Sequence, residues 1–146
     1  MKESVGQEQG FRIEDDPRRE DVAFLNARIY EYNASATGVD DGRWLTIFVR
    51  EADETIIAGL HGWTWGGTGF VESLWVRDNL RGCGLGSRLL LAAETEARQR
   101  GCHQMYLDTH SYQAPAFYRR LGYEVIGTLP GWPGTDIRHF LRKTLT

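Results

Sequence analysis

The sequence has few of the features that mark disulfide-bonded, metal-binding or membrane-spanning proteins. It contains 2 cysteines among 146 residues, and we expect Cys83 and Cys102 at opposite ends of one helix, too far apart for a disulfide. Its 4 histidines lack the paired spacing of a zinc site, so no metal is predicted. No apolar run approaches the roughly 20 residues of a membrane-spanning helix. Free thiols are typical of a reducing compartment, and we expect a cytoplasmic protein with no membrane partner.

The sequence also lacks an excess of one charge sign. Its net charge of −3 argues against broad attraction to nucleic acid or anionic lipid, so we expect no nucleic-acid partner. With 41% hydrophobic and 25% charged residues, the composition is that of an ordinary folded domain. The length predicts a single domain over residues 1–146. The polar residues 1–10 are predicted to be flexible and not to be a secretory signal.

The N-terminal part is predicted to contain one strand and one helix. A short strand is expected at residues 11–14, after which Asp16-Pro17 fits an N-cap followed by proline at the first helical position. Apolar residues then recur at steps of three and four from Val22 to Ile29, which predicts a helix. Residues 33–42 continue no such pattern and are predicted to be a loop.

Three strands are predicted in the next part of the chain. Residues 44–50, 55–65 and 70–76 are rich in β-branched and aromatic side chains. The polar residues 51–54 and the glycine-rich residues 66–69 separate these runs as short connections. We therefore expect three antiparallel strands joined in sequence.

The second half of the chain alternates helices and strands. Periodic apolar residues predict an amphipathic helix over residues 84–100, which ends in a basic turn followed by a glycine. Further elements are predicted as a strand at residues 105–107, a helix at 115–121 and strands at 123–128 and 139–145. This order predicts an α+β fold with a mixed sheet, in which a crossover helix joins two parallel strands.

A glycine-rich loop precedes the predicted helix. Gly82, Gly84 and Gly86 have no side chains, so backbone N–H groups can approach an anion closely, and the helix N-terminus adds positive potential. An ordinary tight turn is the alternative interpretation. The Rossmann pattern GxGxxG does not fit, because Ser87 or Leu89 stands where its last glycine belongs, and no Walker A Gly-Lys-Ser/Thr follows. The loop therefore indicates a pyrophosphate site of another kind.

Two separated motifs carry a family resemblance. Residues 81–86 read Arg-Gly-Cys-Gly-Leu-Gly, and residues 113–123 read Gln-Ala-Pro-Ala-Phe-Tyr-Arg-Arg-Leu-Gly-Tyr. They resemble the Q/R-x-x-G-x-G/A loop and the N/Q-A-x-x-F-Y-x-x-x-G-F/Y segment of the GNAT superfamily of acyl-CoA-dependent N-acyltransferases. The resemblance covers residues 69–128. It implies a central, mixed, mostly antiparallel sheet flanked by helices, with splayed fourth and fifth strands, and acetyl-CoA as the acetyl-donor cosubstrate.

The resemblance also implies where acetyl-CoA binds. In this family the pantetheine arm inserts between the two splayed strands, which here implies pairing with the backbone of residues 74–76. Backbone amides of residues 82–87 would hold the pyrophosphate, with the side chain of Arg81 or Arg88 as a further contact. Gln113 stands where asparagine is commoner, and its longer arm keeps the amide group. The implied acetyl-CoA-binding residues are Leu74, Trp75, Val76, Arg81, Gly82, Cys83, Gly84, Leu85, Gly86, Ser87 and Gln113.

Acetyl transfer requires a neutral amine, yet an alkylamine with a pKa of about 10.4 is mostly protonated near neutral pH. Glu72 is our first candidate for the general base that accepts this proton. Strand alternation is expected to put it on one face with Phe70 and Leu74, where a carboxylate is unusual. A salt bridge at the sheet edge is the alternative role for Glu72.

The departing thiolate requires a proton or another form of stabilisation. Tyr118 matches the tyrosine of the second motif, and the resemblance implies that it is the general acid. The alternative is a core tyrosine that packs beside Phe117. A backbone N–H near Val76 would polarise the thioester carbonyl.

Two other reactive side chains are weaker candidates. Cys83 at a helix N-terminus invites a covalent acyl-enzyme, but no histidine is near it in sequence and the family transfers acetyl directly. His110 is expected near the cleft, either as a base or substrate contact or as a hydrogen-bonded structural residue. The aromatic residues of the first half are expected mostly in the core, with some lining an amine cleft that suits a cation.

The motifs together predict an N-acetyltransferase that moves an acetyl group from acetyl-CoA to a primary amine of a small molecule by direct transfer. One alternative is a protein lysine or N-terminal acetyltransferase, which would present an open groove as wide as a peptide. Another is a regulatory domain that binds acetyl-CoA without catalysis. The expected partners are acetyl-CoA and a small amine, and a homodimer is left open.

Overall fold

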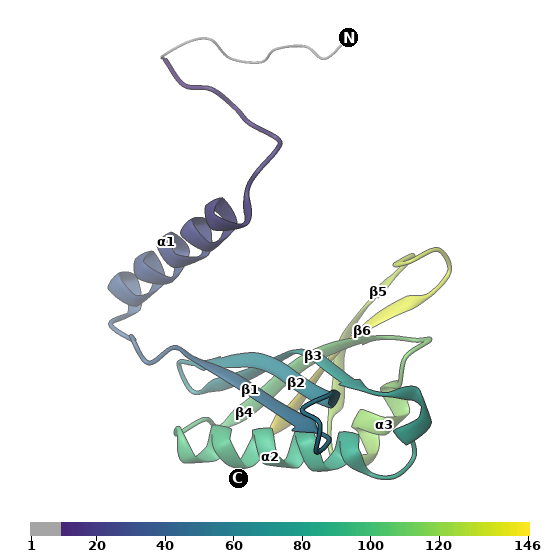
Figure 1. Ribbon diagram of the computed structural model, residues 1–146. Coiled ribbons are helices and arrows are strands. Elements are labelled where there is room, and N and C mark those ends of the chain that lie inside the picture. The colour runs from purple at the N-terminus through teal and green to yellow at the C-terminus, as the bar shows by residue number, and fades with distance from the viewer. Residues whose placement is uncertain (1–9) are drawn as a thin grey trace. The chain divides into compact units, whose positions relative to one another are not determined.

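The computed structural model describes residues 10–146, which divide into two compact units (Figure 1). The first unit covers residues 10–39 and the second covers Asp40–Thr146. The flexibility predicted for residues 1–10 falls, apart from Gly10, outside the described residues. The single domain over residues 1–146 stays a prediction.

The first unit consists of an irregular segment, residues 10–18, and helix α1 (Arg19–Thr37). The strand predicted at residues 11–14 is wrong, because this segment pairs with no strand among the described residues. The Phe11 and Ile13 side chains are exposed. A strand needs a neighbour to satisfy its backbone N–H and C=O groups, and the local sequence pattern does not supply one.

The bounds of α1 differ from the prediction at both ends. The helix begins at Arg19, beyond Pro17, and the N–H of Arg18 donates to the Asp21 carboxylate at 2.9 Å. It continues through residues 33–37, which were predicted to be a loop, because its end is set by a glycine and not by the end of the apolar stripe. Gly38 adopts the left-handed conformation (φ 73°) and its N–H donates to the carbonyl of Ala34 at 2.8 Å.

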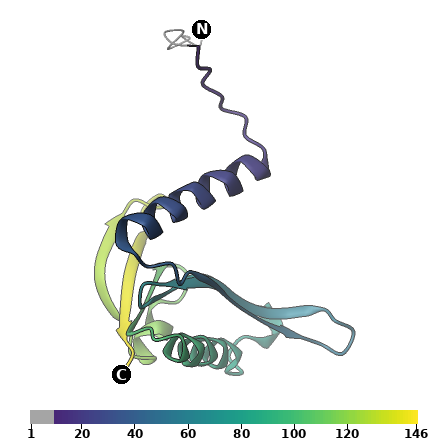
Figure 2. The ribbon, with the colours of Figure 1, turned by 90° about the vertical axis from the view of Figure 1, so that its left-hand side faces the viewer.

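The second unit contains a six-stranded sheet in the order β1-β2-β3-β4-β6-β5. Its last two strands, coloured light green and yellow, lie side by side (Figure 2). The strands are β1 (Arg43–Arg50), β2 (Ile56–Trp65), β3 (Thr68–Val76), β4 (Gln104–His110), β5 (Glu124–Pro130) and β6 (Ile137–Thr144). The helices are α2 (Leu85–Gln99) and α3 (Pro115–Arg120), and η1 (Asp78–Leu80) is a short 3-10 turn. β3 and β4 are parallel and are joined through α2, while the other neighbouring strands are antiparallel. The predicted α+β class with a crossover helix is confirmed.

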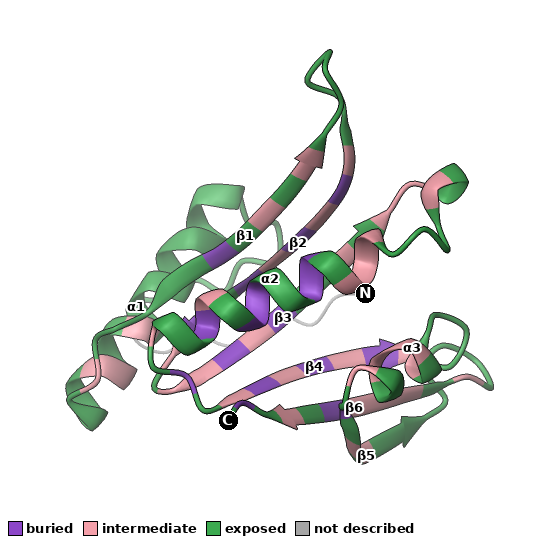
Figure 3. Ribbon diagram, turned by 90° about the horizontal axis from the view of Figure 1, so that it is seen from below, coloured by how far each residue is buried: buried purple, intermediate pink, exposed green. Residues whose placement is uncertain are grey.

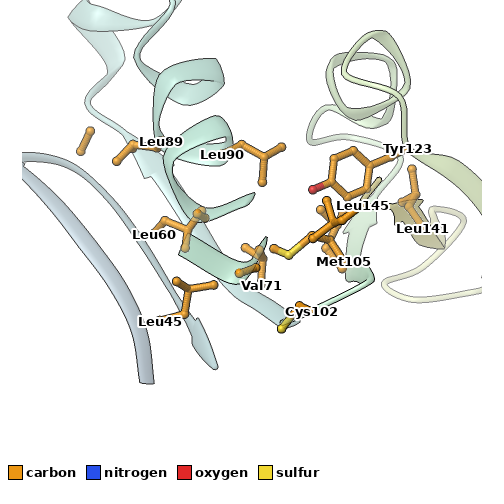
Figure 4. Packing of buried hydrophobic residues seen from close by; sticks show 14 residues of the cluster. Leu45, Leu60, Val71, Leu89, Leu90, Cys102, Met105, Tyr123, Leu141 and Leu145 are labelled. Carbon is orange, nitrogen blue, oxygen red and sulfur yellow. The ribbon is translucent and has the colours of Figure 1, made fainter. Parts of the chain in front are cut away.

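Helix α2 covers one face of the sheet and supplies much of the core (Figure 3). Its buried apolar residues follow the predicted helical period and are Leu89, Leu90, Ala93 and Ala97. Leu45 of β1, Leu60 of β2 and Val71 of β3 belong to the same buried cluster (Figure 4). Burial of these alternating strand residues fixes which side of each strand points toward α2.

One carboxylate is buried on the same helix. Glu94 is 1% exposed, and it accepts hydrogen bonds from Lys143 Nζ at 2.9 Å and from the Tyr123 hydroxyl at 3.0 Å. Burial, and then the charge of Glu94, raises the pKa of Tyr123, so its hydroxyl remains a donor. This polar cluster ties α2 to β6 and to the residue before β5.

The parallel strands β3 and β4 stay together for only part of their length. Their pairing runs from Thr68 opposite Gln104 to Val71 opposite Leu107 and then stops. The remaining residues of both strands diverge toward η1 and α3 (Figure 3). The splayed pair expected from the resemblance is therefore confirmed, although these strands are the third and fourth of the described chain because the expected first strand is absent.

A β-bulge interrupts β3 at the point where the two strands part. His61 of β2 pairs with Ser73, but Gly62 pairs with Val71, so Glu72 is an extra residue without a partner on β2. The expectation that Glu72 shares a face with Leu74 is therefore wrong, because the extra residue resets the alternation. Leu74 packs against the core, whereas the Glu72 side chain is exposed.

The bulge depends on a glycine in β2. A Cβ added to Gly62 would lie 1.8 Å from the carbonyl oxygen of Phe70, so we expect Gly62→Ala to lower the free energy of unfolding by at least about 3 kcal/mol. Denaturant unfolding checks this value. Gly127→Ala in β5 is the matched control, because an added Cβ there meets no atom within 4 Å, and its change should stay near about 0.5 kcal/mol. Equal stability of the two variants would contradict the close approach of β2 and β3.

Candidate active site

A groove of about 960 Å³ opens where β3 and β4 diverge. It is lined by the end of β3, the glycine-rich loop, the start of α2, the end of β4 and α3. Of the residues predicted from the sequence, the lining contains Glu72, Leu74, Trp75, Val76, Arg81, Gly82, Gly84, Leu85, Gly86, Ser87, Gln113 and Tyr118. Cys83 does not line it. The two sequence motifs and the candidate acid and base thus meet at one cavity.

The glycine-rich loop presents backbone donors to this groove. Gly82 and Gly84 have φ values of 79° and 87°, and Gly84 is the N-cap of α2. Both conformations favour glycine, and a Cβ at either position would meet no protein atom within 4 Å. The N–H groups of residues 85–87 belong to the first turn of α2, where no intrahelical acceptor exists. This end of α2 is therefore suited to an anion.

Gly86 has a different role. A Cβ at this position would lie 3.3 Å from Cζ of Phe117 and 3.9 Å from Val76. Gly86 thus lets the first turn of α2 approach α3 and β3 closely.

The charged and thiol side chains near the loop have specific partners. Arg81 donates from Nε to the carbonyl of Val76 at 3.3 Å and pairs with Asp78 at 3.0 Å, so it joins the loop to the end of β3. Arg88 does not line the groove. The Cys83 thiol donates to the carbonyl of Leu80 at 2.6 Å. The thiol is therefore held within the loop, away from the groove lining.

Glu72 is not isolated, because a histidine on β2 lies beside it. Nε2 of His61 is 3.6 Å from a carboxylate oxygen of Glu72, and Nδ1 of His61 lies 2.7 Å from the Thr46 hydroxyl. The Trp44 ring stacks on His61 with centroids 5.2 Å apart. Sequence reasoning did not identify His61. The residue lies on β2 opposite the bulge of β3, and this position follows from the strand register, which the sequence does not show.

Tyr118 lies in an apolar part of the groove. Its ring contacts Phe117 and Tyr123 at centroid distances of 5.0 and 6.0 Å. Burial, and then the nearby charge of Asp108, raises the pKa of Tyr118 to about 12. The phenol therefore stays protonated at neutral pH and can donate a hydrogen bond into the groove.

Asp108 is a groove residue that sequence reasoning missed. It accepts a hydrogen bond from Nε of Arg138 at 2.8 Å, and the Arg138 guanidinium lies 4.0 Å from the centre of the Trp132 ring. Arg138 lies on β6, and Trp132 lies in the loop between β5 and β6. Their approach to Asp108 depends on β4 pairing with β6, for which the local pattern of β4 gives no signal.

Gln113 and His110 organise the loop between β4 and α3. The side-chain oxygen of Gln113 accepts hydrogen bonds from the Thr109 hydroxyl at 3.0 Å and from the N–H of His110 at 2.8 Å. Nδ1 of His110 lies 2.9 Å from the carbonyl of Trp132, and its ring stacks on Tyr112. His110 does not line the groove. This geometry favours the structural role among those left open for His110.

Residues 10–123 match the model of the acetyltransferase (GNAT) family, and the chain therefore belongs to this family and is an acyltransferase. An acetyltransferase of Agrobacterium fabrum, Atu2258, is 41% identical over 98 residues, which are 67% of this chain and 72% of that protein. The blasticidin-S acetyltransferase of Streptomyces morookaense is 43% identical over 76 residues, 51% of this chain and 56% of that enzyme. The second match thus spans little more than half of the relative.

The fold comparison agrees with the sequence comparison. The crystal structure of an acetyltransferase from Bacillus cereus superposes with a TM-score of 0.76 at 28% identity, covering 92% of this chain and 98% of that one. Within residues 10–146, no helix is long and apolar enough to cross a membrane. In the same residues, no group of three or more His, Cys, Asp or Glu side chains is placed to hold a metal ion.

The geometry of the loop predicts that Gly84→Asp weakens binding of acetyl-CoA at least about a hundredfold. A carboxylate there would bring negative charge to the N-terminus of α2, and the φ of 87° disfavours any side chain. Calorimetric titration with acetyl-CoA measures the change. Gly134→Asp is the control, since Gly134 also has a positive φ (58°) and no atom within 4 Å of an added Cβ, but does not line the groove. Unchanged affinity in folded Gly84→Asp would remove the loop from the binding site.

Proposed function

We propose that the protein is an N-acetyltransferase that moves an acetyl group from acetyl-CoA to the primary amine of a small molecule by direct transfer. One observation carries the proposal. A single groove is lined by the anion-binding start of α2, the diverging ends of β3 and β4, a carboxylate and a protonated phenol. These are the groups needed to bind a pyrophosphate and a thioester and to move protons during acyl transfer.

The chain's own residues fit acetyl-CoA. The N–H groups of residues 85–87, with Gly82 and Gly84, would hold the pyrophosphate, because the space that a Cβ would take at these glycines is open. The backbone of residues 74–76, which β4 no longer pairs, would hydrogen-bond the pantetheine arm as an added strand does. The side-chain NH2 of Gln113 would reach the same arm while its oxygen holds the loop.

Glu72 is proposed as the proton acceptor. Acetyl-CoA supplies the acetyl group as a thioester. As the amine nitrogen forms its bond to the carbonyl carbon, the carbon–sulfur bond breaks and one proton leaves the nitrogen. Glu72 lines the groove and is exposed to solvent, so it can attract the ammonium form and take up this proton directly or through water. A backbone N–H near Val76 would polarise the carbonyl.

Tyr118 is proposed as the group that acts on the leaving sulfur. A thiol has an ordinary pKa of about 8.5, which is lower than the pKa of about 12 for Tyr118. Tyr118 therefore assists mainly by donating a hydrogen bond while the carbon–sulfur bond breaks. Tyr118 keeps its proton. The released thiolate, whose thiol has a pKa of about 8.5, takes a proton from solvent near neutral pH, and Glu72 returns to solvent the proton that it accepted from the amine, so the proton balance closes.

A small-molecule acceptor is supported by one of the relatives. The Streptomyces morookaense enzyme is named for blasticidin-S, a small molecule. A panel of small amines, lysine peptides and N-terminal peptides, each assayed for acetyl-CoA-dependent release of the CoA thiol, tests the proposal. Turnover of small amines supports it. Preference for the peptides would favour a protein acetyltransferase, and binding of acetyl-CoA without turnover of any acceptor would favour a regulatory domain.

For Tyr118→Phe we expect turnover to fall by roughly ten- to a thousandfold with little loss of acetyl-CoA affinity. The ring is retained and only the donor is lost. Because burial raises the Tyr118 pKa to about 12, the phenol stays protonated as pH rises, and wild-type turnover should show no loss from its ionisation up to about pH 10. Tyr106→Phe, outside the groove lining, is the control. Wild-type turnover in Tyr118→Phe, with chemistry rate-limiting, would assign Tyr118 to the core only.

Glu72→Gln separates a base from a cation-attracting group. If Glu72 is the base, kcat at neutral pH should fall about tenfold or more, and rising pH should restore part of it because more amine is already neutral. If Glu72 only attracts the ammonium ion, the loss should appear in KM for the amine and shrink at high salt.

The control for this variant is Glu124→Gln, whose carboxylate forms an exposed ion pair with Arg142 on the far strands β5 and β6. Its pH–rate profile should match that of the wild type. Superimposable profiles for wild type and Glu72→Gln would exclude both roles and leave the contact with His61 as a structural one.

A further inference from the structure

A second, smaller hollow lies on the side of the sheet turned away from α2. Its volume is about 160 Å³, and its lining residues are Phe48, Ile56, Gly59, Leu60, His61, Ser73 and Trp75. Strand alternation fixes its side. Gly59 lies between the buried Ala58 and Leu60, and Trp75 lies between two residues that pack against the core. The hollow therefore opens away from the core.

Gly59 forms the floor of this hollow. Phe48 of β1 and Trp75 of β3 both pair with Gly59, so the three residues form one row across the strands. The two aromatic side chains stand on either side of a residue that has none. A Cβ at Gly59 would lie 2.7 Å from Cδ1 of Phe48. The Phe48 ring therefore lies against Gly59, and the hollow that remains, which we call the slot, lies between this phenyl ring and the indole ring of Trp75.

The slot borders the proposed active-site groove. Ser73 and Trp75 line both cavities. His61, at the inner end of the slot, lies 3.6 Å from Glu72, which lines the groove. A molecule whose amine reaches Glu72 can therefore extend past His61 into the slot.

The lining of the slot defines the chemistry of its occupant. Phe48, Ile56 and Trp75 present apolar surface and are 50%, 38% and 48% exposed, so an apolar group placed between them would remove that surface from water. Of the lining residues, His61 and Ser73 have polar side chains, and both lie at the end near the groove. The Arg50 guanidinium lies 5.7 Å from the centre of the Phe48 ring. An apolar cavity of about 150 Å³ is large enough for a benzene ring.

We propose that this slot, formed by Phe48, Gly59 and Trp75, binds a flat apolar or aromatic substituent of the acceptor, so that the preferred substrate is a primary amine carried on such a group. The inference rests on the proposed function, because it assigns the amine to Glu72. The inference specifies which part of the acceptor the protein recognises besides the amine. His61 lies between the apolar slot and the Glu72 carboxylate.

The test compares two amines that differ by a ring. For the full-length protein we expect kcat/KM for 2-phenylethylamine to exceed that for ethylamine at least about tenfold, since filling an apolar pocket discriminates by about this factor or more. Gly59→Val adds a side chain whose Cβ would lie 2.7 Å from the Phe48 ring, so it displaces this wall of the slot and should bring the ratio close to one, with the loss mainly in KM for 2-phenylethylamine. Ethylamine, which does not reach the slot, should keep its kcat/KM within about threefold.

Gly127→Val is the matched control, because it adds the same side chain to a strand glycine of β5 that has no atom within 4 Å of an added Cβ. It should keep the wild-type ratio. Phe48→Ala removes one wall of the slot and should also lower the ratio, which provides a second variant if Gly59→Val does not fold. The proposal would be overturned if the wild-type protein showed a kcat/KM ratio near one. It would also be overturned if both slot variants kept the ratio of the wild type.

A binding measurement separates the slot from the catalytic proposal. Titration of 2-phenylethylamine should shift the NMR signal of the Trp75 indole N–H, identified by its loss in Trp75→Phe, and Gly59→Val should abolish the shift. Binding without turnover of either amine would support the slot and contradict the acetyltransferase assignment. Turnover of other amines without this binding would support the acetyltransferase and overturn the slot.

Discussion

The close approach of β2 and β3 at Gly62 is the constraint on which the site depends. An added Cβ there would lie 1.8 Å from the carbonyl oxygen of Phe70, so only glycine allows the bulge that leaves Glu72 without a partner. The bulge returns the next residues of β3 to the core and turns the carboxylate toward His61. The same bulge therefore places Leu74 and Val76 against the core and Glu72 beside His61.

The divergence of β3 and β4 leaves backbone hydrogen-bonding groups of β3 without a partner on β4. Backbone N–H and C=O groups at the end of β3 face a neighbour that has diverged, and unpaired backbone groups of this kind are ready to bind another extended chain. The first turn of α2 adds unpaired N–H groups at the same groove. The unpaired backbone groups of β3 and of the first turn of α2 therefore lie at one groove. Tyr118 lies deeper, where burial keeps its hydroxyl protonated.

Local sequence signals predicted the elements of the second unit well. The period of α2, the turns between β1, β2 and β3, and the glycines that end α2 and α3 all act over a few residues, so their pattern is sufficient. The first unit shows where such reasoning fails. Residues 11–14 have an apolar alternation but pair with no described strand, and α1 ends at Gly38 and not where its apolar stripe ends.

The features of the candidate site also fall into those that local sequence predicts and those that depend on the tertiary structure. The sequence by itself determined the glycine-rich loop before α2, the motif that contains Tyr118 and the presence of a carboxylate in β3, because each is a contiguous pattern whose backbone chemistry is local. Only the tertiary structure decided that Glu72 leaves the regular alternation, that His61 lies beside it and that Asp108 acts on Tyr118. It also decided that Gly59 separates two aromatic rings. These relations depend on strand register, which is set by burial across the whole sheet and not by neighbouring residues in the chain.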